Sequence, residues 1–445
     1  MFKRKAYQEL LDWKKQWAGK YAILLEGARR VGKSTIVKEF AKNEYKSYIL
    51  IDFAKAEKRI LDCFDDIGDL DTFFLRIQSE TKITLYSRKS AIIFDEVQLF
   101  PKARQAIKYL VEDGRYDYIE TGSLISIKKN VQNILIPSEE MKIQVNPMDY
   151  EEFCDAVGFN YSLLKELYEL KKPIGESTNR SLIHDLRLYL AVGGMPQAVD
   201  AYVKKKNFSE IDKIKREIIN LYEEDLKKID PSGRLSKLFS SIPAQLVANK
   251  KNFSFKASGN KGKTSKDEER IFDLIDSKVV NPCYRLFEPN LSLNLATDLD
   301  KFKLYVLDTG LFVTMLFNNG TKDYEDIYAK LLSDKISLNL GYLYENLAAQ
   351  MLVAANKNLY YYCWKKKNSN HQYEIDFLFI HKNKVAPLEV KSNSIRFHDS
   401  IDEFKNKYSK LCGQRYILST KDYKRSDDLT NIPFYLLSFL LNDDN

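Results

Sequence analysis

The chain has 445 residues, of which 44% are hydrophobic and 13% aromatic, and it contains only 17 Gly and 11 Pro. This composition excludes a disordered, collagen-like or low-complexity chain, and the length exceeds the roughly 250–300 residues at which a single core stops growing. The formal net charge is +8, from 70 Lys and Arg against 62 Asp and Glu. We therefore expect a globular protein of several domains.

The distribution of cysteines and apolar residues indicates a cytoplasmic protein. No window approaches eighteen consecutive apolar residues, and the basic N-terminus runs into a polar segment instead of the apolar core of a signal peptide. Neither a disulfide framework nor a thiolate zinc site is expected, because the five cysteines are scattered and none lies in a C-x-x-C pair: Cys63, Cys154, Cys283, Cys363 and Cys412.

The first third of the chain alternates short apolar runs with longer amphipathic stretches. We expect strands over residues 21–26, 48–52, 91–95, 116–121 and 142–145. This alternation predicts an α/β fold with a mainly parallel, doubly wound sheet, and we assign residues 1–146 to that domain.

Three further segments follow. Residues 147–230 are predicted to be a helical lid or connector, because apolar residues such as Ile211, Ile214 and Ile218 repeat at helical spacing. Residues 231–295 hold three helical runs and a strand, which predicts a winged-helix-like module. Residues 296–445 are predicted to form a second α/β domain, with helices over 341–355 and 401–408 and strands over 303–307, 360–364, 375–380, 385–390 and 416–418.

A phosphate-binding motif, G-x-x-x-x-G-K-[ST], lies between the first predicted strand and a helical run over residues 35–41. Its glycines let backbone N–H groups close around phosphate oxygens, Lys33 supplies a positive charge to the β- and γ-phosphates, and the Ser34 hydroxyl can ligate Mg²⁺. We therefore predict a site for ATP and Mg²⁺ formed by Gly27, Ala28, Arg29, Arg30, Val31, Gly32, Lys33, Ser34 and Thr35.

Two adjacent acids end the apolar strand over residues 91–95. Because ligands bind at the carboxyl edge of a parallel sheet, Asp95 is predicted to hold Mg²⁺ and Glu96 to orient or deprotonate the attacking water. Thr121 and Ser123 follow another strand, where a hydroxyl could sense the γ-phosphate or position water, although an ordinary polar turn is an equal alternative. Lys33, Glu96 and Ser123 are the candidate catalytic residues of this domain.

Six strings along the chain carry a resemblance to a known family. They cover residues 25–35, 93–98, 121–123, 189–196, 241–246 and 303–311. Together they resemble a family of prokaryotic AAA+-like ATPases, whose members pair an N-terminal P-loop core with a C-terminal domain of unknown function. The resemblance implies an ATPase core, a winged-helix module and a nuclease-like end domain. The later strings are more specific to the family than the phosphate loop, which many ATPases share.

An E-x-K pattern in the last domain places Glu389 and Lys391 on one face of a predicted strand, and Asp376 lies on the preceding strand of a hairpin. Two carboxylates and a lysine would converge there, and Glu345 on the predicted helix over 341–355 could complete an Mg²⁺ site. This arrangement resembles the PD-(D/E)XK nuclease core, in which a helix glutamate, an aspartate and an E-x-K strand recur in that order. Lys391 would then be the catalytic lysine, but a nuclease-like fold can also be kept for binding alone.

The basic excess is concentrated in residues 231–290, which contain 11 Lys and Arg against 6 Asp and Glu. Residues 250–266 are nearly free of acids and lead into a predicted helix over 265–275, the position of a recognition helix in a winged fold. DNA contact and a solvated loop are equal alternatives here. Asp267, Glu268 and Glu269 open that helix, and acids are favourable at a helix N-terminus for structural reasons alone.

Two functions remain open from the sequence. In the first, an AAA+-like ATPase uses Mg-ATP to drive its winged-helix and nuclease-like half on nucleic acid. In the second, the chain is a nucleotide-dependent switch or scaffold that binds a protein partner and keeps an inactive nuclease-like fold. DNA, a protein and further copies of the chain are the partners considered, and no membrane partner is expected. His371, His381 and His398 are expected to be ordinary surface or structural residues, because none has ligand spacing to another.

Overall fold

The computed structural model describes residues 1–123, 137–255, 266–317, 324–333, 341–366, 369, 371–392 and 398–443. Internal contacts divide the chain into two compact units. The first unit is Met1–Asn146 with Asp276–Lys278, and the second is Pro147–Ile275 with Val279–Asn445. The finer division into a connector, a winged-helix-like module and a nuclease-like domain stays a prediction.

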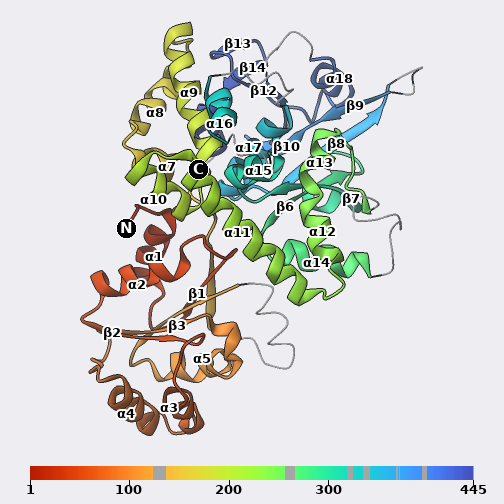
Figure 1. The fold of residues 1–445 in the computed structure, drawn as a ribbon. Coiled ribbons are helices and arrows are strands. Elements are labelled where there is room, and N and C mark those ends of the chain that lie inside the picture. Colours follow the sequence, from red (N-terminus) through yellow and green to blue (C-terminus); the bar gives the residue numbers. More distant parts are fainter. Residues whose placement is uncertain are drawn as a thin grey trace. The chain divides into compact units, whose positions relative to one another are not determined.

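A five-stranded parallel sheet forms the centre of the first unit, in the order β2-β3-β4-β1-β5 (Figure 1). The predicted parallel, doubly wound sheet is confirmed, and each predicted strand begins and ends close to an observed one. Apolar runs form these strands because both faces of such a sheet are buried. The strands are β1 (Ala22–Glu26), β2 (Ser47–Asp52), β3 (Ser90–Asp95), β4 (Asp117–Gly122) and β5 (Glu140–Gln144).

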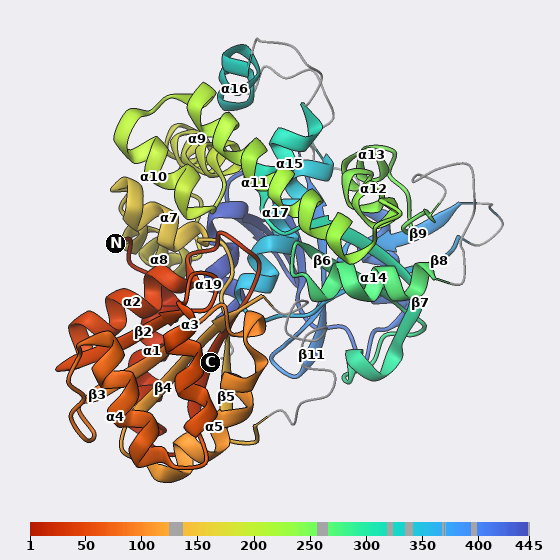
Figure 2. The same cartoon turned by 60° about the horizontal axis from the view of Figure 1, so that its bottom comes forward.

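Helices cover both faces of this sheet. Figure 1 shows α1 and α2 on one side and α3, α4 and α5 on the other, and Figure 2 shows the same unit turned toward the viewer. Leu24 and Phe94 of the strands share a buried core with Phe73 of α4 and Leu110 of α5. The helices are α1 (Lys5–Gln16), α2 (Lys33–Glu44), α3 (Lys58–Leu61), α4 (Leu70–Thr81) and α5 (Pro101–Asp113).

Helices also make up the first part of the second unit, as the apolar spacing of residues 147–230 predicts. Side chains cap several of them: Asp149 accepts the N–H of Glu152 at 2.9 Å, and Asn207 accepts that of Glu210 at 3.1 Å. The helices are α7 (Tyr150–Val157), α8 (Tyr161–Leu170), α9 (Glu176–Val192), α10 (Pro196–Lys205), α11 (Phe208–Ile229), α12 (Arg234–Ser240), α13 (Ile242–Val247) and α14 (Asp267–Asp276).

Two sheets follow these helices, with the strand orders β7-β6-β8-β9 and β10-β11-β12-β14-β13. The strands are β6 (Val280–Leu286), β7 (Thr297–Val306), β8 (Leu359–Lys365), β9 (Gln372–Ile375), β10 (Phe377–His381), β11 (Lys384–Lys391), β12 (Arg415–Ser419), β13 (Lys424–Ser426) and β14 (Leu429–Pro433). The helices among them are α15 (Thr309–Leu316), α16 (Tyr324–Leu332), α17 (Gly341–Ala354), α18 (Asp399–Lys407) and α19 (Leu437–Leu441).

The structure differs from the sequence-based prediction at one place in these sheets. The predicted strand over residues 375–380 corresponds to β10, but it begins too early, because Ile375 ends β9, which pairs with β8, and β10 pairs with β11. Asp376 is the residue at this change of sheet. The strand β6 pairs antiparallel with β7 and parallel with β8.

Glycine lets two segments of the second unit touch through their backbones. A Cβ atom on Gly310 would lie 2.5 Å from the Cα atom of Gly193. The Asp308 carboxylate bridges the two segments, because it accepts the backbone N–H of Gly194 at 2.6 Å and the backbone N–H of Leu311 at 2.9 Å. The strings 189–196 and 303–311, which stand apart in the sequence, therefore meet at one buried contact.

Lys215 on α11 is a fully buried lysine beside the same contact. Its Nζ atom donates to the carbonyls of Ala191 at 2.6 Å and Gly310 at 3.2 Å, and to the Tyr328 hydroxyl at 3.0 Å. Burial lowers the pKa of Lys215 to about 8, although Asp212 and Asp308 act to raise it. Because all three donors of the ammonium are used, this lysine joins α9, α11 and α15 and has no donor left for a ligand.

The structure holds all five cysteines as free thiols. In the part of the chain that it describes, no helix combines the length and the apolar character needed to cross a bilayer.

Candidate nucleotide site and carboxylate cluster

The phosphate loop connects β1 to α2, as the motif predicts. Gly27 has φ +153°, and a Cβ atom there would lie 2.3 Å from the Val145 carbonyl oxygen. Gly32 precedes the first residue of α2 with φ +99°, in the left-handed region that favours glycine. Both glycines of the motif are therefore required by the backbone path of the loop.

Lys33 begins α2 and turns back over the loop. Its side chain is buried, with 6% of the residue exposed, and Nζ donates to the carbonyls of Gly27 at 3.0 Å and Ala28 at 2.9 Å. Burial lowers the pKa of Lys33 to about 8, while the nearby carboxylates of Glu96 and Asp95 act to raise it. The ammonium thus sits inside the loop, at the position that the motif predicts for a phosphate contact.

Ser34, Asp95 and Thr121 meet at one carboxylate oxygen. The Ser34 hydroxyl donates to Asp95 Oδ1 at 2.7 Å, and the Thr121 hydroxyl donates to the same oxygen. Thr121 also accepts the backbone N–H of Glu96 at 3.3 Å. The structure therefore brings together the ends of β3 and β4 and the start of α2, as their shared sheet edge predicts.

Glu96 follows Asp95 in the left-handed conformation, with φ +56°. Its carboxylate is half-buried and accepts a hydrogen bond from the Gln98 side chain.

Ser123 is buried, and its hydroxyl makes no hydrogen bond to another described residue. The predicted catalytic role of Ser123 stays a prediction. Of the remaining loop residues, Ala28 and Val31 are buried, Arg29 is half-buried, and Arg30 and Thr35 are exposed.

Arg4 is a buried residue of this site that the sequence analysis missed. Its guanidinium donates to the Val31 carbonyl at 2.9 Å, inside the phosphate loop, and to the Asn146 carbonyl at 2.7 Å. Charge-assisted bonds of this kind hold the loop against the segment after β5. A lone arginine near an N-terminus carries no sequence pattern that predicts such a contact, because its acceptors are backbone carbonyls far along the chain.

The four residues predicted for a metal-dependent nuclease lie close together in the second unit. Lys391 Nζ is 2.9 Å from Glu389 Oε2, as expected for residues two apart on β11. Asp376 accepts the backbone N–H of Val390 at 2.8 Å, which fixes it beside that strand. Glu345 projects from α17. The negative charge of Asp376 acts to raise the pKa of Glu345, and the negative charge of Glu345 acts to raise the pKa of Lys391.

Burial perturbs the carboxylates of this cluster. It raises the pKa of Glu345 to about 7, against the opposing charge of Lys303, and Asp376 adds to the rise. It raises the pKa of Glu389 to about 7 as well, against the opposing charge of Lys391. Glu389 is only 3% exposed. Such shifts are typical of clustered carboxylates that lack full hydration.

Three further residues, Lys303, Tyr305 and Glu374, belong to the cluster and were not predicted as site residues. Lys303 on β7 is 4% exposed, and its Nζ lies 2.6 Å from Glu374 Oε1 and 3.9 Å from Glu345 Oε2. The Tyr305 hydroxyl donates to Glu345 Oε2 at 3.2 Å. Within the described ranges, no three His, Cys, Asp or Glu residues are grouped so that they could hold a metal ion.

The basic segment of residues 231–290 is less free than its composition indicates. Asp267 is fully buried and accepts both Arg234 Nε and Nη2 at 2.8 Å and Arg270 Nη1 at 3.1 Å. Arg285 pairs with Asp298 at 2.8 Å. Three of the counted cations are thus bound to acids within the fold. Of the nearly acid-free residues 250–266, on which the DNA prediction depends, residues 256–265 lie outside the described residues.

Three family models match parts of the chain. Residues 19–154 match the family described as an AAA domain. Residues 183–322 and 340–437 match two families described as domains of unknown function, DUF8612 and DUF4143. No curated protein matches the chain.

Solved structures with a detectable likeness are remote. The ORC1 protein of Aeropyrum pernix in complex with DNA has 11% identity and a TM-score of 0.29, over 72% of this chain and 93% of that one. A Signal Transduction ATPase with Numerous Domains from Pyrococcus horikoshii has 12% identity and a TM-score of 0.28, over 80% and 49%. AMPPCP-bound DnaA from Aquifex aeolicus has 11% identity and a TM-score of 0.26, over 62% and 88%. We draw nothing from likeness at this level. The family match and the parallel sheet with its phosphate loop identify an AAA-type P-loop domain in the first unit.

Proposed function

We propose that the first unit binds Mg-ATP in the loop of residues 27–35 and hydrolyses it. The hydrogen bond between Ser34 and Asp95 carries this proposal, because it places the hydroxyl and the carboxylate expected to hold Mg²⁺ within 2.7 Å of each other. Oxygen ligands of this kind suit Mg²⁺, which keeps several waters and takes its other ligands from phosphate.

The residues of the loop fit a nucleoside triphosphate. Gly27 leaves no room for a Cβ atom, because the Val145 carbonyl oxygen lies there, so the loop backbone packs directly against the segment after β5. Backbone N–H groups of such a glycine-containing loop can surround phosphate oxygens. Lys33 donates to two carbonyl oxygens that phosphate oxygens can replace. Ser34 and Asp95 would hold the metal, which would neutralise charge on the β- and γ-phosphates. Glu96 would orient the attacking water, and Thr121 would keep Asp95 in place through its hydrogen bond.

Steady-state hydrolysis of ATP by the full chain, measured with and without DNA, tests this proposal. We expect Mg²⁺-dependent turnover that Lys33→Ala removes. Stimulation by DNA would connect the first unit to a nucleic-acid function of the second. Absence of turnover under every condition would contradict the enzymatic part of the proposal and leave nucleotide binding to be measured separately.

We further propose that the second unit combines a winged-helix-like module with a PD-(D/E)XK-like fold acting on nucleic acid. Helices α12, α13 and α14 precede the β6–β7 hairpin, which is the order of a winged helix. From α17 the order is helix, strands β8 to β11, helix α18 and strand β12, and β11 carries Glu389 and Lys391. This order supports the resemblance that the E-x-K pattern indicates.

DNA binding at varied salt concentration tests the nucleic-acid part. Contact with several phosphates predicts an affinity that falls steeply as salt rises. Undetectable affinity for duplex and single-stranded DNA at low salt, with and without ATP, would contradict it.

A second candidate function is a nucleotide-dependent switch or scaffold that binds a protein partner and keeps an inactive nuclease-like fold. The position of Lys303 favours it. The Lys303 ammonium gives Glu374 and Glu345 the positive charge that a divalent cation would otherwise give them. A buried lysine and a metal ion in the same cluster would repel each other, so this pairing disfavours metal binding.

Replacement of Lys303 separates the two candidates. If the lysine serves in place of a metal, Lys303→Met should bind one more Mn²⁺ ion per full chain than the wild type, read as a larger loss of the free Mn²⁺ signal in electron paramagnetic resonance. Lys301→Met is the matched control, because Lys301 lies on the same strand with 45% of its side chain exposed. Mn²⁺ binding and plasmid nicking by the wild type, both lost in Asp376→Ala, would instead favour the active nuclease.

A further inference from the structure

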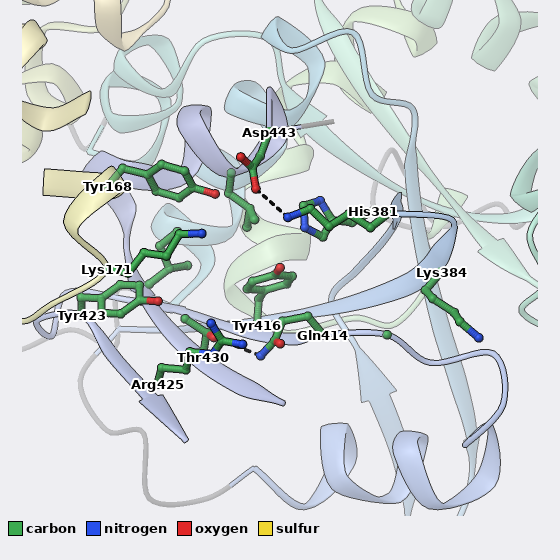
Figure 3. Close-up of a pocket in the computed structure, with 14 residues that line it drawn as sticks. Tyr168, Lys171, His381, Lys384, Gln414, Tyr416, Tyr423, Arg425, Thr430 and Asp443 are labelled. Atoms are coloured by element: carbon green, nitrogen blue, oxygen red, sulfur yellow. Dashed lines mark hydrogen bonds and ion pairs between the residues drawn. The ribbon is translucent and has the colours of Figure 1, made fainter. Parts of the chain in front are cut away.

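A pocket of about 240 Å³ lies in the second unit, apart from the carboxylate cluster (Figure 3). Its walls come from α8, the end of β10, the strands β12 to β14 and α19. The side chains that matter for its chemistry are Tyr168, Lys171, His381, Tyr416, Tyr423 and Arg425.

Strand register places this pocket on the face of its sheet opposite to Glu389. Tyr416 pairs with Leu388 on β11 and with Thr430 on β14, whereas Glu389 pairs with Ile417. Paired residues point to the same face and successive residues to opposite faces. Tyr416 and Thr430 therefore face away from Glu389, and a ligand in the pocket would not contact the carboxylate cluster.

Buried polar groups form the inner wall of the pocket. His381, Tyr416, Tyr423 and Thr430 are each more than nine-tenths buried, with exposed fractions of 6%, 6%, 8% and 5%. The Thr430 hydroxyl accepts a hydrogen bond from the Gln414 side chain at 3.1 Å. The rings of His381 and Tyr416 pack in a T-shaped arrangement, with their centroids 5.8 Å apart. These contacts fix the wall, so the pocket is built into the sheet and is not a gap between mobile surface chains.

Positive charge dominates the rim. Four of the lining residues are Lys or Arg, namely Lys171, Lys382, Lys384 and Arg425, and one is an acid, Asp443. Lys382 Nζ lies 3.0 Å from Asp443 Oδ2, so one cation is neutralised. Lys171 has no hydrogen bond or ion pair with any residue that the structure describes, and Figure 3 shows its ammonium turned toward the pocket beside the Tyr168 hydroxyl. The rim therefore attracts anions.

The Tyr168 hydroxyl points into the pocket beside Lys171 and makes a hydrogen bond with the Asp443 carboxylate, which a bound anion would replace as its acceptor. Burial, followed by the negative charge of Asp443, raises the pKa of Tyr168 well above the usual value. A phenol that stays protonated can donate to an anion without competing for its charge.

We propose that this pocket binds the phosphate group of a small phosphomonoester, with Lys171, Arg425 and the Tyr168 hydroxyl as its donors. A guanidinium and an ammonium are the side chains that most often hold phosphate, and tyrosine rings provide a flat surface for an attached base or sugar. The closed inner wall and the volume suit a small molecule. A nucleic acid strand would instead require a groove open at both ends.

Lysine acylation followed by mass spectrometry tests this proposal on the full chain, with inorganic phosphate, AMP and a short single-stranded DNA as separate probes. Mass spectrometry measures the labelling of each lysine separately. Binding of AMP to the phosphate loop is therefore read at Lys33 and binding to the pocket at Lys171. We expect AMP to slow the labelling of Lys171 about tenfold when it is present at about ten times its Kd. Inorganic phosphate should give the same protection at higher concentration if the phosphate group provides the recognition.

Substitutions locate the donors. Arg425→Ala and Lys171→Ala should each weaken AMP binding about tenfold, read as protection of Lys382. Lys424→Ala and Lys172→Ala are matched controls, because each removes the same charge one residue away and neither residue lines the pocket. Three results would overturn the proposal: no more protection at Lys171 than at Lys172, equal effects of the control substitutions, or protection by DNA alone.

Discussion

The Ser34 hydroxyl donates a 2.7 Å hydrogen bond to Asp95 Oδ1, and so joins the first turn of α2 to the end of β3. These residues are 61 positions apart in the sequence. Their contact exists because only β4 separates β3 from β1 in the sheet, and all three parallel strands end at the same edge. The relationship places two oxygen ligands beside Lys33, at the edge where parallel sheets bind ligands.

Replacement of Ser34 should separate magnesium binding from nucleotide binding. Ser34→Ala removes one proposed metal ligand, so we expect ATP affinity to fall about tenfold in the presence of Mg²⁺ and to change little in EDTA. Isothermal titration calorimetry under both conditions measures this difference. Lys42→Ala is the control, because Lys42 is an exposed residue in the last turn of the same helix, outside the loop. Equal losses with and without Mg²⁺ would mean that Ser34 acts on the loop and not on the metal.

Replacement of Lys33 should remove most of the nucleotide affinity. The ammonium is expected to exchange the carbonyls of Gly27 and Ala28 for phosphate oxygens, and hydrogen bonds to charged groups of this kind are worth about tenfold to a hundredfold in affinity. We therefore expect Lys33→Ala to raise the Kd for ATP by that factor in equilibrium binding. Lys38→Ala, which removes an exposed lysine from the same helix, should leave the Kd unchanged.

The contacts of Arg4 predict an effect of the N-terminal segment on the loop. Arg4→Met keeps a long apolar stem but leaves the Val31 and Asn146 carbonyls without their charged donor. We expect a loss of about 2–4 kcal/mol in the free energy of unfolding of the first unit, together with weaker ATP binding. Arg59→Met, at an exposed surface pair with Glu57, should change neither quantity by more than about 1 kcal/mol. Normal ATP affinity in Arg4→Met would show that the loop holds its shape without this residue.

Lys215 predicts a pH dependence of stability in the second unit. Its pKa is about 8 in the folded chain, chiefly because of burial, against 10.5 in the unfolded chain. Between these values the unfolded chain binds more protons than the folded one, so the stability of the wild type should rise with pH. Below pH 8 both states are protonated and the cost of burying the charge is constant.

Lys215→Met lacks this titration. The difference in free energy of unfolding between wild type and variant should therefore shift in favour of the wild type, by about 3 kcal/mol, as the pH rises from 8 to 10.5. Chemical denaturation across this range measures the shift, and Lys213→Met, exposed on the same helix, is the control. A difference that does not change with pH would contradict this prediction, because it would show that the pKa of Lys215 is the same in the folded and the unfolded chain.

Patterns of local origin could be predicted from the sequence. The strands of the first unit follow from unbroken apolar runs such as residues 91–94, and the phosphate loop follows from fixed spacing between a strand and a helix. Glu389 and Lys391 share a face because strand geometry alone requires it. The structure brings Ser34, Asp95 and Thr121 together for a similar reason, since parallel strands end at a common edge, and their roles stay predictions.

Contacts between distant segments could not be predicted in this way. Arg4 and Lys303 are buried charges whose acceptors lie on other segments, and nothing in their own neighbourhoods marks them as buried. The predicted start of the strand over residues 375–380 was wrong, because apolar residues stand on both sides of Asp376 and the sequence does not mark the point where the chain changes sheets. His381 was expected to be an ordinary residue, and only the fold places it in the wall of a pocket.

The central claim is that the first unit hydrolyses ATP with Glu96 as the residue that activates water. Steady-state turnover and equilibrium ATP binding of Glu96→Gln test it most directly, with Glu112→Gln, an exposed acid on α5, as the matched control. The account predicts that Glu96→Gln binds ATP as the wild type does and loses about a hundredfold to ten-thousandfold in turnover, since the amide cannot accept the proton. Turnover by Glu96→Gln at the wild-type rate would contradict the account.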